Sequence, residues 1–120
     1  MAKIHIIRNE DVEKVLIGAP KNHKHLRICM KLKNGTILVF QEATIANISR
    51  AYVTLKTHPS VQAQELRMKT LTEAQRKEGY ATNQLIETSK DSNEVKTELR
   101  EILEKVESST KFSRNLFYPI

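Results

Sequence analysis

The chain has 120 residues, 39% of them hydrophobic and 28% charged, which is the size and composition of one globular domain. No apolar run is long enough to cross a bilayer, and the N-terminal segment lacks the apolar stretch of a secretory signal. Its single cysteine, Cys29, excludes an internal disulfide. We therefore expect one domain over residues 1–120, located in the cytoplasm and without a membrane partner.

The formal net charge of +6 is distributed unevenly along the chain. Residues 1–40 carry eight Lys and Arg against three Asp and Glu, whereas residues 91–120 carry five against six. A basic N-terminal half attracts polyanions such as nucleic acid, although an excess of this size also serves plain solubility. Charge therefore permits a polyanion partner without requiring one.

Two strands are predicted before residue 20. Residues 3–8, KIHIIR, read as a first strand, and residues 12–20, VEKVLIGAP, read as a second.

A β-hairpin over residues 25–42 is the central element. Asn34-Gly35 lies between two β-rich runs, and this dipeptide is typical of a two-residue type I′ turn. Such a turn pairs Lys33 with Thr36 and Met30 with Val39, and paired residues share a face. The first face then carries the core residues Leu26, Ile28, Met30, Leu32, Ile37 and Val39. The second face carries an apolar centre ringed by cations, namely Cys29, Leu38 and Phe40 with Arg27, Lys31 and Lys33.

The first helix is predicted over residues 44–57. Ile45, Ile48, Tyr52 and Leu55 fall at helical spacing, and Thr44 is a suitable N-cap. Pro59 disfavours helical geometry at His58 and should end the helix there.

Residues 61–88 leave two alternatives open. We expect strands near 61–71 and 80–88 joined by a loop, while a helix over 72–85, interrupted by Gly79, is the competing interpretation. A C-terminal helix over 92–108 follows, with Asp91 as a cap and an apolar stripe. The stripe consists of Val95, Leu99, Ile102, Leu103 and Val106. Together these elements predict an α+β fold, a mostly antiparallel sheet of four to six strands with two helices.

The chain ends in an apolar tail over residues 110–120. Its large side chains need a surface to cover, and the Leu38 and Phe40 patch of the hairpin is the candidate, on its own sheet or on a partner subunit. The predicted interaction surface consists of Leu38, Phe40, Leu116, Phe117, Tyr118 and Ile120.

No catalytic, cofactor or metal motif is expected. His25 and Cys29 would share a strand face but lie about 13 Å apart along an extended strand, too far to hold one ion. Cations near the hairpin form a predicted polyanion site, which consists of Lys21, Lys24, Arg27, Lys31 and Lys33.

The sequence therefore indicates a small binding domain that is not an enzyme and forms a homo-oligomer, with a dimer favoured. Two alternatives remain, namely nonspecific nucleic-acid or polyanion binding through the basic hairpin face, and an enzyme whose site forms between subunits.

Overall fold

The computed structural model describes residues 3–110, and it describes side chains as far as residue 106. The elements follow in the order η1 (Asn9–Asp11, a 3₁₀ turn), β1 (Val12–Gly18), β2 (Arg27–Leu32), β3 (Ile37–Gln41), α1 (Glu42–Thr57), β4 (Leu66–Thr70), β5 (Asn83–Glu87) and α2 (Ser92–Thr110). The strands form two antiparallel sheets, β1–β2–β3 and β4–β5. The α+β class is confirmed, and its five strands divide between two sheets.

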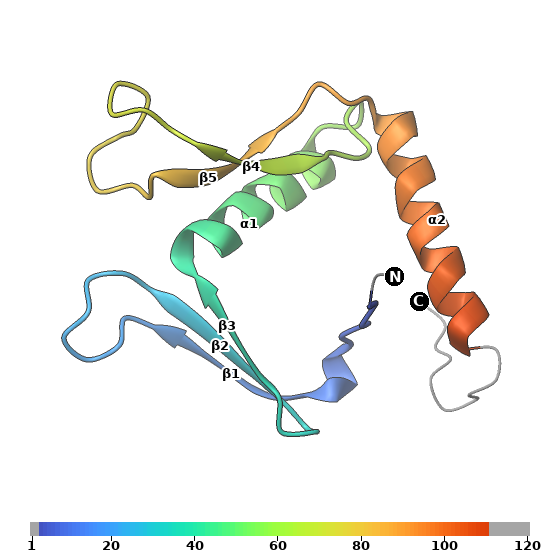
Figure 1. Ribbon diagram of the computed structural model, residues 1–120, viewed down its shortest axis with the longest axis horizontal. Coiled ribbons are helices and arrows are strands. Elements are labelled where there is room, and N and C mark those ends of the chain that lie inside the picture. The colour runs from blue at the N-terminus through green and yellow to red at the C-terminus, as the bar shows by residue number, and fades with distance from the viewer. Residues whose placement is uncertain (1–2, 111–120) are drawn as a thin grey trace.

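The elements surround a central opening (Figure 1). Helix α1 links the two sheets, the β4–β5 hairpin lies across α1, and α2 runs along the opposite side. The N-terminal segment returns toward the C-terminal end of α2. The radius of gyration is 17.1 Å, whereas a compact chain of this length has about 14 Å. The fold is therefore an open ring.

The β2–β3 turn differs from the predicted one. The Leu32 N–H donates to the Thr36 carbonyl at 2.8 Å, and the Gly35 N–H donates to the Leu32 carbonyl at 3.0 Å. Gly35 has a φ of 94°, and the only non-glycine residue of positive φ in the described part of the chain is Asn22. A type I′ turn needs positive φ at both central residues, so this is a three-residue loop with a glycine in the left-handed region.

This longer loop shifts the pairing register by one residue. Lys31 now pairs with Ile37, and Met30 pairs with Leu38. The predicted register and its two faces are wrong, because a one-residue slip moves each β3 side chain to the opposite face relative to β2.

Helix α1 begins two residues before the predicted cap and ends as predicted at Thr57, ahead of Pro59. Asn47 is buried, and its Nδ2 donates to Gln84 Oε1 on β5 at 2.9 Å. Strand β5 therefore packs on the Asn47 side of α1. Ile48 and Tyr52, in the middle of the predicted apolar stripe, remain 48% and 60% exposed.

The predicted strands near 61–71 and 80–88 are present as β4 and β5, and no helix lies between them. Residues 3–8, in contrast, form no strand. They are followed by η1, where Arg8 Nη2 contacts Asp11 Oδ1 at 2.7 Å. An alternating segment becomes a strand only where a neighbouring backbone takes up its hydrogen bonds, and none of the described strands pairs with this one.

Helix α2 is capped as predicted, since the Glu94 N–H donates to Asp91 Oδ1 at 2.9 Å. Only the two ends of its apolar stripe are buried, at Val95 and Val106, each 8% exposed. The middle of the stripe remains open, at Leu99, Ile102 and Leu103. The helix therefore packs at its two ends and lies along one side of the ring.

A polar cluster fixes the N-terminal end of α2. The Thr88 hydroxyl donates to Glu65 Oε1 at 2.9 Å, and Lys90 Nζ reaches Glu65 at 3.4 Å and Glu98 on α2 at 2.8 Å. The Thr88 hydrogen bond, followed by those from Lys90 and Arg67, holds the pKa of Glu65 below its ordinary value, against the opposing effect of desolvation.

We predict that Glu65→Gln destabilises the fold at neutral pH and that this loss fades in acid. A carboxyl group whose pKa is lowered on folding stabilises the protein above its unfolded-state pKa, and that stabilisation disappears as pH falls through the folded-state pKa. Urea unfolding at pH 7 and toward pH 3 measures the difference. Glu73→Gln, at an exposed acid outside this cluster, is the control. An equal effect of Glu65→Gln at both pH values would contradict the prediction.

Candidate interaction surface

Strand pairing assigns the side chains of the three-stranded sheet to two faces, because directly opposite residues share a face. We name each face after one member. The Ile28 face carries Val15, Ile17, Ile28, Met30, Leu38 and Phe40. The Leu16 face carries Lys14, Leu16, Arg27, Cys29, Lys31, Ile37 and Val39.

The Leu16 face holds an exposed apolar row. Leu16 pairs with Cys29, which pairs in turn with Val39. Leu16 is 59% exposed and Val39 is 62% exposed, while Cys29 between them is half-buried. Ile37 adds a further exposed side chain to the same face. No described helix packs against it closely.

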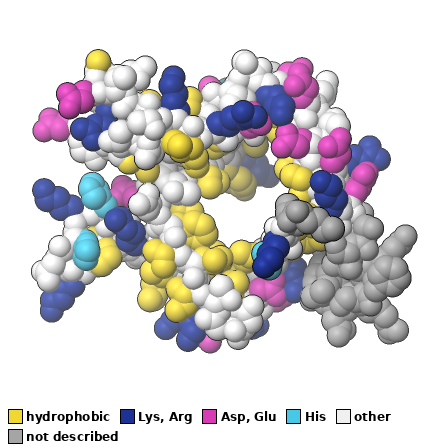
Figure 2. Space-filling model, viewed as in Figure 1, with side chains coloured by type: hydrophobic (Ala, Val, Ile, Leu, Met, Phe, Trp, Pro, Cys, Tyr) yellow, Lys and Arg dark blue, Asp and Glu magenta, His cyan; other side chains and the backbone are white. Residues whose placement is uncertain are grey.

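Apolar side chains also remain uncovered elsewhere on the ring. Figure 2 shows hydrophobic side chains gathered around the central opening. Eighteen large apolar side chains of the described residues are exposed, and only four hydrophobic residues are buried. The buried ones are Ile28, Ala63, Val95 and Val106. The ring thus lacks a closed core of its own.

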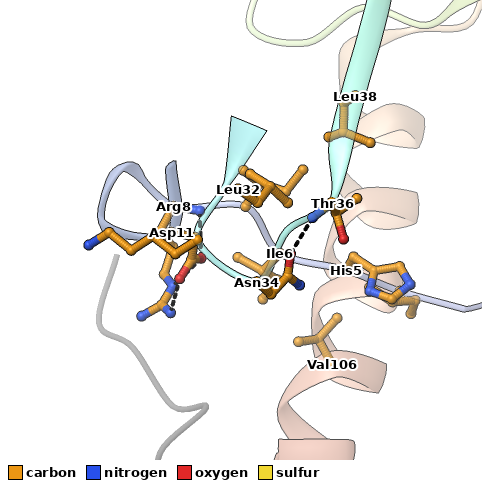
Figure 3. Close-up of a pocket in the computed structure, with 12 residues that line it drawn as sticks. His5, Ile6, Arg8, Asp11, Leu32, Asn34, Thr36, Leu38 and Val106 are labelled. Carbon is orange, nitrogen blue, oxygen red and sulfur yellow. Dashed lines mark hydrogen bonds and ion pairs between the residues drawn. The ribbon is translucent and has the colours of Figure 1, made fainter. Parts of the chain in front are cut away.

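An apolar cavity of about 760 Å³ lies between the N-terminal segment, the β2–β3 turn and the end of α2. Ile6, Leu32 and Leu38 line it from one side and Val106 from the other, while the Arg8–Asp11 ion pair lies at its polar margin (Figure 3). The side-chain and backbone hydrogen bonds of Arg8 hold the pKa of Asp11 below its ordinary value. The aspartate therefore stays ionised beside an apolar surface.

The predicted apolar patch does not form on one face. Leu38 and Phe40 are half-buried on the Ile28 face, whereas Cys29 lies on the Leu16 face. The other members of the predicted interaction surface, residues 116–118 and 120, lie outside the described residues.

The predicted cations are spread along the sheet. Lys21 and Lys24 lie in the β1–β2 loop, and Lys33 lies in the β2–β3 turn at the other end of the strands. Lys31, between these ends, contacts Glu13 at 3.3 Å. Arg27 is half-buried and donates to the Leu26 carbonyl at 3.0 Å.

Arg27 instead joins a polar groove of about 390 Å³ between β2, the start of α1 and the segment before β5. His25 and Arg50 also line this groove, together with Tyr80. Its one acid, Glu42, accepts a hydrogen bond from the Leu26 N–H at 2.8 Å. The groove is therefore cationic, and sequence reasoning did not connect Arg50 with Arg27 because 22 positions separate them.

Two of the most exposed apolar side chains of the sheet were also missed. Leu16 and Ile17 lie on opposite faces of β1, 59% and 67% exposed. The signal for them was present, since an uninterrupted Val-Leu-Ile run places apolar side chains on both faces of a strand.

Comparison with protein-family models, with curated proteins and with solved structures gave no significant match. Within residues 3–110, no helix has the length and apolar character to cross a membrane. The described His, Cys, Asp and Glu side chains form no group of three or more that could hold a metal ion.

The cavity beside Val106 offers a test of the predicted tail. Val106 lies four residues before the last described residue, Thr110. We expect truncation after Thr110 to lower the free energy of unfolding by about 3 kcal/mol, the value of burying one or two large apolar side chains. Urea unfolding measures this free energy. Light scattering on the same samples shows whether the tail covers its own chain or a partner subunit. Monomers throughout would indicate covering within one chain, and loss of a dimer would indicate exchange.

Two double variants of the full-length chain provide a matched comparison for this test. Phe117→Ser with Tyr118→Ser should reproduce the loss of stability, whereas Ser113→Ala with Arg114→Ala should not. Unchanged stability and unchanged mass after truncation would show that the tail covers no apolar surface.

Proposed function

We propose that this chain is a non-catalytic binding domain that completes its apolar core by associating with a second copy of itself. The observation that carries the proposal is the open ring, in which, among the residues whose side chains are described, eighteen exposed large apolar side chains far outnumber four buried hydrophobic residues. Monomeric proteins rarely expose apolar surface on this scale without a binding role.

Energetics support association over a stable isolated monomer. Ordering a backbone costs about 1–2 kcal/mol per residue, and apolar burial is the main term that offsets this cost. The chain exposes 10320 Å², whereas a compact monomer of 13.8 kDa exposes about 6,600 Å². Obligate dimers bury roughly 2,000–5,000 Å² in total, so a surface excess of this kind is what such an interface requires.

The surroundings of Cys29 support a binding role over catalysis. Its cross-strand neighbours are Leu16 and Val39, which are apolar and provide no base. A thiol in such a row packs as a small hydrophobic side chain.

A second candidate is polyanion binding in the polar groove. Its support is that His25, Arg27 and Arg50 line one groove from different elements, while its one acid already accepts a backbone hydrogen bond. Guanidinium groups placed this way suit phosphate oxygens. This candidate relocates the basic site from the hairpin face to the groove.

The dimer is tested by light scattering and by thermal unfolding at several protein concentrations. We expect a dimer mass and a melting temperature that rises with concentration, because association stabilises the folded state by mass action. Leu16→Lys, which places a charge on the apolar row where that row reaches β1, should weaken dimerisation about tenfold or more. Gln41→Lys is the matched control, because Gln41 is exposed on the same face and its replacement removes no apolar side chain. A monomer with a concentration-independent melting temperature would refute association.

The groove is tested with a fluorescent single-stranded oligonucleotide at low salt. We expect binding that weakens steeply as salt is added, because each neutralised phosphate releases a counterion. Arg50→Gln should lower affinity and reduce the salt slope by about one. Lys96→Gln, at an exposed cation on α2 that does not line the groove, should leave both unchanged. No binding at low salt would remove this candidate.

A further inference from the structure

The outer edge of β1 is the most open part of the three-stranded sheet. Strand β1 pairs with β2 on one side, and no described strand lies on its other side. Such an edge presents a row of unpaired backbone N–H and C=O groups. Natural edges are protected by proline, by charge or by irregular pairing, yet Val15–Leu16–Ile17 contains no proline and no charge. The only irregularity of β1, between Val12 and Lys14, lies at one end.

Exposure confirms that this edge is uncovered on both faces. Val15 is 47% exposed, Leu16 is 59% exposed and Ile17 is 67% exposed. Three consecutive exposed apolar residues on an unpaired edge form a template for another strand.

The sequence of β1 is complementary to itself in one antiparallel register. A twofold axis normal to the sheet keeps each residue on its own face. One residue must then lie directly opposite its own copy, and the axis passes midway between the two. Centred on Leu16, it pairs Leu16 with itself, Val15 with Ile17, and Lys14 with Gly18. Centred on Val15, it would instead place Lys14 opposite Leu16 and Glu13 opposite Ile17. Centred on Ile17, it would pair Val15 with Ala19 and Lys14 with Pro20, which lie beyond the end of β1. Of these three registers, the Leu16-centred one keeps apolar side chains opposite each other within the strand, and it gives Lys14 a neighbour without a side chain.

The same register continues the apolar rows of the sheet into a second copy. On the Leu16 face, the row Val39–Cys29–Leu16 meets the same row of the second copy, related by the twofold axis. On the Ile28 face, the row that contains Leu38, Met30 and Val15 meets the row that contains Ile17, Ile28 and Phe40 of the second copy. Each face of the joined sheet would then carry apolar rows six residues wide.

Charge at the two ends of β1 favours the same arrangement. Three acids outnumber two cations at its start, Glu10, Asp11 and Glu13 against Arg8 and Lys14, whereas Lys21 and Lys24 follow its end. Antiparallel pairing brings the acidic start of one copy toward the basic end of the other, which adds attraction and disfavours a parallel arrangement.

We infer that the second copy binds along the outer edge of β1, with Leu16 on the twofold axis, to form one six-stranded antiparallel sheet. This inference rests on the proposed homodimer and specifies its interface. The partner is a second copy because the self-pairing register, the continued rows and the charges at both ends are all properties of this one chain.

Disulfide trapping tests the arrangement in the full chain. Leu16→Cys in a Cys29→Ser background should form a cross-linked dimer under mild oxidation, because opposite Cα atoms across a strand pair lie about 4.5–5.5 Å apart. Lys14→Cys in the same background is the matched control on the same face. The two control thiols would be four residues apart along the strands, about 13 Å, which is beyond disulfide reach.

A mixing experiment with two different cysteine variants determines the register of the β1–β1 pairing independently of Leu16→Cys. Chains with Val15→Cys and chains with Ile17→Cys, both carrying Cys29→Ser, should cross-link to each other when mixed and should not cross-link alone. Circular dichroism on each variant confirms that it is folded.

The outcomes separate this inference from the proposed function. A dimer that cross-links through Leu16→Cys and in the Val15–Ile17 mixture supports both. A dimer by light scattering that gives neither cross-link overturns the β1 interface and leaves the proposed homodimer standing. A monomer overturns both, and covering of the edge by the chain's own tail or by another protein would produce that result.

Discussion

The backbone of the β2–β3 turn determines which side chains share a face of the three-stranded sheet. Gly35 takes a positive φ and closes a three-residue loop on Leu32 and Thr36. That loop pairs Ile28 with Phe40, and it leaves Cys29 opposite Val39. The half-buried Ile28 face and the open Leu16 face both follow from this register, as do the apolar rows that extend to β1. The three-residue length of this loop therefore determines which side chains each face carries.

The ring closes through local contacts and not through a shared core. Helix α2 is fixed near Val95 by a polar cluster around Glu65, and at Val106 it lines the cavity beside the N-terminal segment, with an uncovered stretch between. The β4–β5 hairpin is joined to α1 through the Asn47–Gln84 hydrogen bond. A neutral hydrogen bond contributes only about 1 kcal/mol, so polar contacts of this kind orient the elements without supplying most of the folding free energy. The remaining energy must come from covering the apolar surface.

Sequence patterns predicted the kinds of elements better than the faces they present. Asn34-Gly35 marked the hairpin correctly, yet two- and three-residue loops both place Gly35 at positive φ, and only tertiary structure distinguishes them. On α1 the apolar periodicity is real, but β5 packs on the side of Asn47 because a polar pair forms there. The polar groove joins residues that no spacing rule connects. A periodic pattern shows which side chains are apolar, and it cannot show which partner covers them.

Pairing an edge and covering a face meet different physical requirements. Backbone groups along β1 need directional hydrogen bonds, so an edge contact specifies register, orientation and the identity of the partner strand. Apolar faces need only removal from water, which is proportional to area and insensitive to register. In this ring, the unpaired edge and the open faces belong to the same sheet, because β1 carries exposed side chains on both sides. A second copy docked at β1 would therefore take its specificity from the edge, while the Val15, Leu16 and Ile17 side chains that flank this edge on both faces would provide the apolar contacts with the partner strand.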